Sequence, residues 1–154
     1  GNVETRLRKA EEAGWQGVVL AAAGLKRLGL GGLIAERGLL LEPEDMLPAP
    51  AQGILGLETR VGDVQTLPLL QPLHNEASHR QALAERAFLR HMEGGCHAPM
   101  GAFCRLLGEE FEIEGFFQTE KNFYRQTLRG RLGQEAAFGQ RLAEMIKELI
   151  ASEG

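Results

Sequence analysis

The two cysteines are the most nucleophilic side chains of this 154-residue chain, and their surroundings differ. Cys96 follows Gly94-Gly95 at the end of a segment with helical periodicity, so a bulky ligand could approach the backbone there without meeting a side chain. A helix C-terminus disfavours anions, so we expect no unusual acidity of this thiol on that account. Cys104 lies inside a strand-like run and is typical of a core residue. A lone cysteine is more often structural than functional, and that alternative stays open for Cys96 at this point.

Neither cysteine belongs to a familiar metal or redox motif. A metal site built from His91, Cys96, His97 and Cys104 is an alternative, but the spacing matches no common zinc pattern. No C-x-x-C pair is present, and two cysteines do not make a disulfide framework. We therefore predict no metal site and a reducing compartment, for which the cytoplasm is the simplest choice.

Arginines supply the other candidate chemistry, because their guanidinium groups bind carboxylates in a bidentate way and stay charged at all working pH values. Arg6 stands in a basic cluster with Arg8 and Lys9, and Arg27 follows Lys26. A solvated helix face is the usual role of a single arginine. Arg8 and Lys9 are assigned to the surface, and Lys26 stays ambiguous.

The elements that would position these arginines have an α/β texture. We expect a helix over 3–13, a buried strand over 17–22, and short helices over 25–30 and 33–37. Strand, glycine and helix in this order are typical of an α/β layer. The small residues Ala21 and Gly24 would then lie at the carboxyl end of a strand, where α/β proteins bind ligands. Close helix–strand packing is the alternative explanation for Gly24.

The second half of the sequence predicts a small α+β domain. An apolar run over 54–58 is strand-like, and Pro68 and Pro72 restrict the next segment to short helical turns. The remaining expected elements are a helix over 75–93, three antiparallel strands over 100–107, 111–119 and 123–130, and an amphipathic helix over 135–150.

Composition excludes several classes of function. The hydrophobic content of 44% suffices for a sizeable core, and the net charge of -4 gives no global electrostatic case for nucleic acid or an anionic membrane. No apolar run approaches the roughly 20 residues of a membrane helix. The sequence opens on Gly1-Asn2-Val3 without a methionine or a signal-peptide pattern, which indicates a cut through a larger protein or a second chain of one.

Four segments together resemble the porphobilinogen deaminase (hydroxymethylbilane synthase) family, in the family's order and at about its spacing. They cover nearly the whole chain, and the strands after Gly101 contribute least. The segments are Gly1-Asn2-Val3-Glu4-Thr5-Arg6-Leu7; Leu20-Ala21-Ala22-Ala23-Gly24-Leu25-Lys26-Arg27-Leu28-Gly29; Leu47-Pro48-Ala49 with Gln52-Gly53; and Glu85-Arg86-Ala87-Phe88 with Glu93-Gly94-Gly95-Cys96, Pro99 and Gly101.

The resemblance implies the C-terminal half of a three-domain enzyme. Residues 1–53 would complete domain 2, an α/β domain like those of periplasmic binding proteins. Residues 54–73 would return to domain 1, and residues 74–154 would form the α+β domain that carries the cofactor cysteine. The reaction it implies joins four porphobilinogen molecules head to tail with loss of ammonia, and water releases hydroxymethylbilane, a precursor of haem and other tetrapyrroles.

The resemblance also implies roles for individual residues. Cys96 would bind a dipyrromethane cofactor through a thioether, and Arg6, Ala21 and Gly24 would line that cofactor. Arg6 and Arg27 would bind carboxylates of the substrate and of the growing linear pyrrole chain. The family's catalytic aspartate would precede Gly1, so the chain alone should be inactive and should need the N-terminal half as its partner.

The sequence departs from the family pattern at two places. Pro50-Ala51 stands where the family usually has Val-Gly, which puts the local backbone and its hinge behaviour in question. His97-Ala98 replaces a common Gln-Val after the cysteine. Two alternatives stay open: a non-catalytic anion-binding module that kept the fold, and a fragment that folds only with an N-terminal partner chain.

Overall fold

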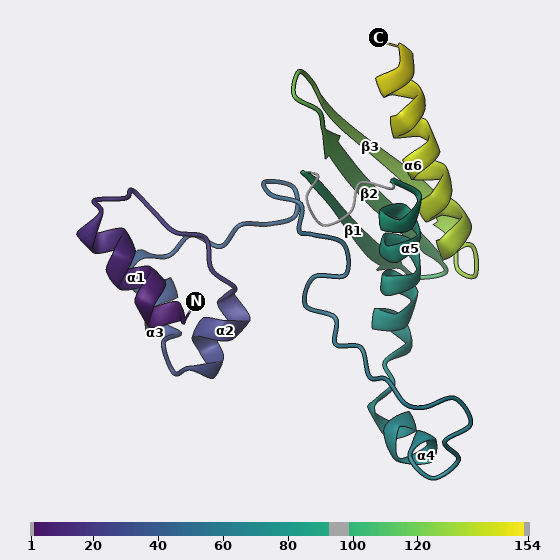
Figure 1. Cartoon of the computed structure of the whole chain (residues 1–154), viewed down its shortest axis with the longest axis horizontal. Coiled ribbons are helices and arrows are strands. Elements are labelled where there is room, and N and C mark those ends of the chain that lie inside the picture. The colour runs from purple at the N-terminus through teal and green to yellow at the C-terminus, as the bar shows by residue number, and fades with distance from the viewer. Residues whose placement is uncertain (1, 93–98, 153–154) are drawn as a thin grey trace. The chain divides into compact units, whose positions relative to one another are not determined.

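The structure is a computed structural model that describes residues 2–92 and 99–152 (Figure 1). The chain divides into two compact units, Gly1–Glu42 and Pro43–Gly154. Cys96, together with Gly94, Gly95 and His97, lies outside the described residues. Among the described residues, no helix has the length and apolar character needed to span a membrane.

The N-terminal unit contains three helices, α1 (Val3–Glu12), α2 (Ala22–Arg27) and α3 (Gly32–Arg37). Asn2 caps α1, because its side-chain oxygen accepts the Glu4 N–H at 3.4 Å. Arg37 on α3 pairs with Glu11 on α1 at 3.3 Å. Ala10 and Leu25 are its buried apolar residues among those described, so this unit has a small core.

The strands expected over 17–22 and 54–58 are not formed, and both predictions are wrong for this chain. Residues 17–21 are irregular, Ala22 already begins α2, and 54–58 are irregular throughout. Val19 is 61% exposed and Leu55 is 86% exposed. A strand needs a neighbour to satisfy its backbone, and each strand of the described structure pairs within 100–131. An apolar run without a partner strand therefore stays irregular, with side chains such as Val19 and Leu55 exposed.

The C-terminal unit contains the small α+β domain that the sequence predicts. Its elements are α5 (Glu76–Met92), β1 (Met100–Leu107), β2 (Glu110–Gln118), β3 (Phe123–Arg131) and α6 (Glu135–Ser152). The strands form an antiparallel sheet in the order β1-β2-β3, with short turns at 108–109 and 119–122. Both helices pack against the sheet (Figure 1). The whole chain is thus mixed helix and strand, consistent with an α/β piece followed by a small α+β domain.

Side chains alternate between buried and more exposed positions along the strands, and the buried ones form the core of this unit. Every second side chain faces the helices, and Cys104, Phe111 and Ile113 are fully buried against Phe88 of α5 and Leu142 of α6. Burying one large apolar side chain contributes about 1.5–3 kcal/mol, so these few residues account for much of the unit's cohesion. Gly115 faces the same layer, where an added Cβ would lie 3.0 Å from both Phe88 and Leu142.

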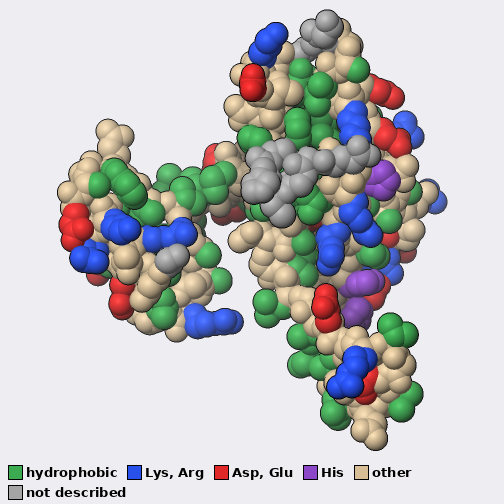
Figure 2. Space-filling model, in the orientation of Figure 1, with side chains coloured by type: hydrophobic (Ala, Val, Ile, Leu, Met, Phe, Trp, Pro, Cys, Tyr) green, Lys and Arg blue, Asp and Glu red, His purple; other side chains and the backbone are tan. Residues whose placement is uncertain are grey.

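A short helical arm precedes α5. It consists of α4 (Leu67–Leu70) and the 3-10 helix η1 (Gln71–Leu73), and each has its proline near its first residue, where the missing N–H costs nothing. Asp63 begins the arm by accepting the Thr66 N–H at 2.9 Å. Figure 2 shows hydrophobic side chains on the surface around this arm. The large exposed apolar residues of 54–73 are Leu55, Leu57, Val61, Val64, Leu67, Leu69 and Leu73.

Candidate functional site

The third and fourth resemblance segments meet in the C-terminal unit. Residues 43–53, which we call the connecting segment, run along the open edge of β1. The Ala102 N–H donates to the Pro48 carbonyl at 3.0 Å, and Leu47 is buried. A Cβ at Gly101 would lie 2.7 Å from the Pro48 oxygen, so this close approach requires glycine. Packing therefore brings together sequence positions that are more than 50 residues apart.

Charged side chains hold the start of the connecting segment. Arg125 on β3 donates to the carbonyls of Pro43 at 3.4 Å and Glu44 at 3.1 Å, and it pairs with Glu114 at 2.6 Å. Arg105 on β1 pairs with the Glu44 carboxylate. Charge-assisted bonds of this kind fix orientation better than neutral ones, so the sheet determines the path of the connecting segment.

Glu85 holds the other end of the connecting segment, a role that the sequence alone does not predict. Its carboxylate is 4% exposed and accepts the Ala51 N–H at 2.6 Å and the Cys104 N–H at 2.8 Å. Burial raises the pKa of Glu85, although the two backbone N–H groups act in the opposite direction. The signal was present in the sequence, because a glutamate here interrupts the apolar face that Ala84 and Phe88 form on α5.

Cys96, the cofactor cysteine that the sequence predicts, lies outside the described residues, and the described residues on either side of 93–98 contact the core. Met92 is buried at the end of α5. On the other side the Pro99 carbonyl accepts the Gln118 N–H at 2.9 Å, immediately before β1 begins. Met92 and Pro99, the described residues on either side of 93–98, are therefore both held by the α+β core.

Cys104 is confirmed as a core residue. It is fully buried, and burial together with the negative charges of Glu85 and Glu135 raises its thiol pKa to about 12. A thiol of this kind is inert as a nucleophile at neutral pH. Among the described residues, no group of three or more His, Cys, Asp or Glu side chains could hold a metal ion. His91 instead places Nδ1 2.8 Å from the Ala87 carbonyl.

The two arginines that the sequence singles out lie on separate helices of the N-terminal unit. Arg6 on α1 and Arg27 on α2 are both exposed. Arg8 pairs with Glu12, and Arg37 pairs with Glu11, whereas within the described residues no hydrogen bond or ion pair engages the side chain of Arg6 or Arg27. Figure 2 shows Lys and Arg side chains gathered on one face of this unit. Because both would bind carboxylates of one linear pyrrole chain, we predict that Arg6 and Arg27 face one shared cleft.

The small residues 21–24 form the start of α2 rather than the end of a strand. Ala21 is the N-cap, and its carbonyl accepts the N–H groups of Gly24 at 3.0 Å and Leu25 at 3.2 Å. A Cβ added at Gly24 would meet no atom within 4 Å. Contacts within the described residues therefore give no packing reason for glycine here.

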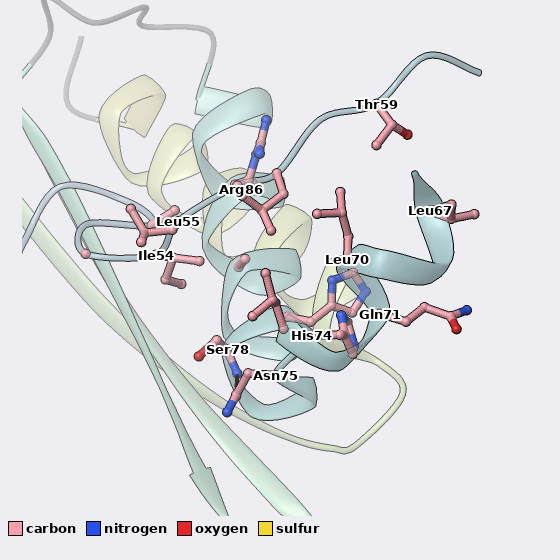
Figure 3. A pocket seen from close by; sticks show the side chains of 17 residues that line it. Ile54, Leu55, Thr59, Leu67, Leu70, Gln71, His74, Asn75, Ser78 and Arg86 are labelled. Carbon is pink, nitrogen blue, oxygen red and sulfur yellow. Dashed lines mark hydrogen bonds between the residues drawn. The ribbon is translucent and has the colours of Figure 1, made fainter. Parts of the chain in front are cut away.

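A pocket of about 1010 Å³ opens in the C-terminal unit between the helical arm, residues 51–59 and α5 (Figure 3). Its wall is largely apolar, with Ile54, Leu55, Leu67 and Leu70. Its polar members are Thr59, Gln71, His74, Asn75, Ser78, His79 and Arg86. The sequence does not predict this pocket, because the residues of its wall belong to segments that are separate in the chain.

Two family models match the chain. Residues 1–68 match "Porphobilinogen deaminase, dipyromethane cofactor binding domain", and residues 79–148 match "Porphobilinogen deaminase, C-terminal domain". This chain belongs to the porphobilinogen deaminase family. The resemblance inferred from the four segments is thereby confirmed.

Curated porphobilinogen deaminases show how much of the family protein is present. The protein from Roseiflexus sp. (strain RS-1) is 43% identical over 147 residues, which are 95% of this chain and 48% of the relative. The protein from Alkaliphilus metalliredigens (strain QYMF) is 41% identical over 99% of this chain and 48% of its own length. The Shouchella clausii (strain KSM-K16) protein is 54% identical over 70% of this chain and 34% of its own length. The chain spans about half the length of the porphobilinogen deaminases it matches.

The structure shows how this member of the porphobilinogen deaminase family accommodates Pro50-Ala51 where the family pattern has Val-Gly. Ala51 has a φ of 62°, in the left-handed region that glycine adopts without cost. The chain therefore keeps a glycine-like backbone at the position where the family pattern has glycine. The hydrogen bond from its N–H to Glu85 accompanies this conformation.

Proposed function

We propose that this chain is the C-terminal half of a hydroxymethylbilane synthase, which condenses four porphobilinogen molecules head to tail with loss of ammonia. The observation that carries the proposal is the match of both halves of the chain to domains of one enzyme family, in the order 1–68 and 79–148. The relatives named above are porphobilinogen deaminases, and the chain aligns with them along nearly its whole length.

The binding residues fit an anionic oligopyrrole in charge and in space. Each porphobilinogen carries an acetate and a propionate, so a growing chain accumulates carboxylates. The guanidinium groups of Arg6 and Arg27 are exposed and unengaged within the described structure, and each can hold a carboxylate through two parallel N–H donors. The open space around Gly24 would let a flat pyrrole approach the start of α2.

The covalent attachment is assigned to Cys96 from its Glu-Gly-Gly-Cys motif and by exclusion of Cys104, which is buried and whose thiol pKa is about 12. When bound, a dipyrromethane cofactor would supply the pyrrole carbon from which the chain of substrates is extended. The proton transfers at the leaving ammonia need a general acid–base group. We place that group, an aspartate, in the N-terminal half, so that this chain alone is catalytically silent.

The domain assignment and the partner follow from the same proposal. We assign 1–53 to domain 2, 54–73 to a segment that returns to domain 1, and 74–154 to the domain of the cofactor cysteine. The exposed apolar residues of 54–73 support an N-terminal half as the covering partner, since an apolar surface of this kind is a mark of an interaction site.

Reconstitution tests the proposal. The chain is mixed with the separately produced N-terminal half, and the consumption of porphobilinogen and the release of hydroxymethylbilane are measured. We expect neither half alone to consume porphobilinogen and the mixture to do so. A reconstituted pair that binds porphobilinogen without turnover would show instead that the chain is part of an anion-binding module.

A further inference from the structure

The open edge of β1 is closed without a fourth strand. Within the part of the chain that the structure describes, β1 pairs with β2 on one side only, and the backbone groups on its other side have no partner strand. Three of them are nevertheless satisfied. The Ala102 N–H donates to the Pro48 carbonyl at 3.0 Å, the Cys104 N–H donates to Glu85 at 2.8 Å, and the Cys104 carbonyl accepts from the Gln81 amide at 2.8 Å.

Two side chains of α5 take the place of a neighbouring backbone. Gln81 and Glu85 are four residues apart, so they lie above one another on the same face of the helix. One presents an amide donor and the other a carboxylate acceptor, and both reach Cys104. An adjacent strand would present the same donor and acceptor pair to this residue.

Glu85 also reaches the connecting segment. Its Oε1 accepts the Cys104 N–H, and its Oε2 accepts the Ala51 N–H at 2.6 Å. We propose that Glu85 is a positioning residue that fastens the far end of the connecting segment 43–53, at Ala51, to the open edge of β1. Nothing in the porphobilinogen-condensing activity proposed above requires this fastening.

The chemistry of the carboxylate explains why glutamate is needed. Both bonds come from backbone N–H donors, and an ionised carboxylate offers an acceptor to each. Glutamine has the same shape but offers one oxygen and one NH₂ group, so one of the two N–H donors would face another donor. The Cys104 N–H is the more deeply buried of the two, so glutamine keeps that bond and releases Ala51.

Other contacts to the segment do not replace this bond. Arg125 and Arg105 act at Pro43 and Glu44, seven or more residues before Ala51. The Pro48 bond to β1 lies three residues before it. Ala51 itself sits at φ 62°, a left-handed conformation that is strained for a residue other than glycine, so it needs an external contact to hold it.

Amide hydrogen exchange of the intact 154-residue chain tests the proposal in the Glu85→Gln variant. The expected result is at least tenfold faster exchange of the Ala51 amide, while the amides of Ile113 on β2 and Leu128 on β3 keep the rates of the unmodified chain. The matched control is Glu148→Gln, which removes an exposed glutamate of α6 and should leave every one of these amides unchanged.

Two outcomes would overturn the proposal: an unchanged Ala51 rate, or an equal acceleration of Ala51, Ile113 and Leu128, which would mean that Glu85 only supports the fold as a whole. If Glu85→Gln does not yield folded protein, Glu85→Asp is measured in the same way. Its charged but shorter side chain cannot span both donors, so the same selective acceleration at Ala51 is expected. If Glu85→Asp shows no selective acceleration at Ala51, the proposal is also overturned.

Discussion

Gly139 on α6 lies directly against the backbone carbonyl of Ala84 on α5, at a distance that leaves no space for a Cβ atom. The two helices meet here over the fully buried core of the C-terminal unit. Substituting Gly139→Ala must therefore push the helices apart, and overpacking of this kind costs about 1–3 kcal/mol. Urea unfolding should show a lower midpoint for Gly139→Ala. Gln140→Ala, at the next and exposed position, should unfold as the unmodified chain does, and a Gly139→Ala variant of equal stability would mean that α5 and α6 do not approach so closely.

Ala51→Gly should stabilise the chain. The left-handed φ of 62° costs an alanine about 1–2 kcal/mol, and glycine removes this cost. Glycine also has greater freedom in the unfolded state, which lowers the free energy of unfolding by about 0.5–1 kcal/mol. A net increase of about 0.5 kcal/mol in the free energy of unfolding is expected from these two terms. Ala49→Gly is the control, because Ala49 has no positive φ and glycine there should only destabilise. Loss of stability in Ala51→Gly would contradict the assigned backbone conformation.

Glu85 should give the stability a specific pH dependence. Burial raises its pKa in the folded chain, so the folded state holds this proton more tightly than the unfolded state does. Its contribution is then fully present below the unfolded pKa of about 4.3 and is lost as the pH rises through the folded pKa. The free energy of unfolding of the unmodified chain minus that of Glu85→Gln should fall with rising pH in this window and then level off. A difference that rises with pH would mean that the two N–H donors outweigh burial.

The sequence was sufficient for those elements whose partners are contiguous in the chain. The strands beginning near Met100, Phe111 and Phe123 were placed to within a residue or two, because each pairs with its neighbour across a short turn and its alternation is visible. The apolar run at 17–22 has the composition of a strand but no partner strand among residues 2–92 and 99–152, and local composition contains no information about the partner.

In the candidate site, too, the sequence predicts the residues whose role depends on local pattern and not those whose partner is distant in the chain. Cys104 was assigned to the core from its place in a strand-like run, and its burial confirms this. The role of Glu85 was not predicted, because it depends on the Ala51 N–H, 34 residues away in sequence. Periodicity marks a glutamate on an apolar helix face as unusual but does not indicate which backbone group it will meet.

Arg6→Lys and Arg27→Lys should each impair elongation in the reconstituted two-half enzyme. Lysine keeps the positive charge but loses the two-donor fork that matches a carboxylate, so a loss of roughly tenfold in kcat/KM is expected, of the order of one charge-assisted hydrogen bond. Arg8→Lys is the matched control on the same helix, since Arg8 is engaged with Glu12 at the surface. Equal activity of all three variants would remove Arg6 and Arg27 from the carboxylate-binding surface.

The assignment of the cofactor thiol is the central claim, and peptide mass mapping of the chain produced together with its N-terminal half tests it most directly. We expect the added mass of a dipyrromethane on the peptide containing Cys96, and we expect Cys96→Ala to abolish it. The peptide containing Cys104 should stay unmodified, because its thiol is buried with a pKa of about 12. An adduct on Cys104, or a fully active reconstituted enzyme whose Cys96 carries no added mass, would contradict it.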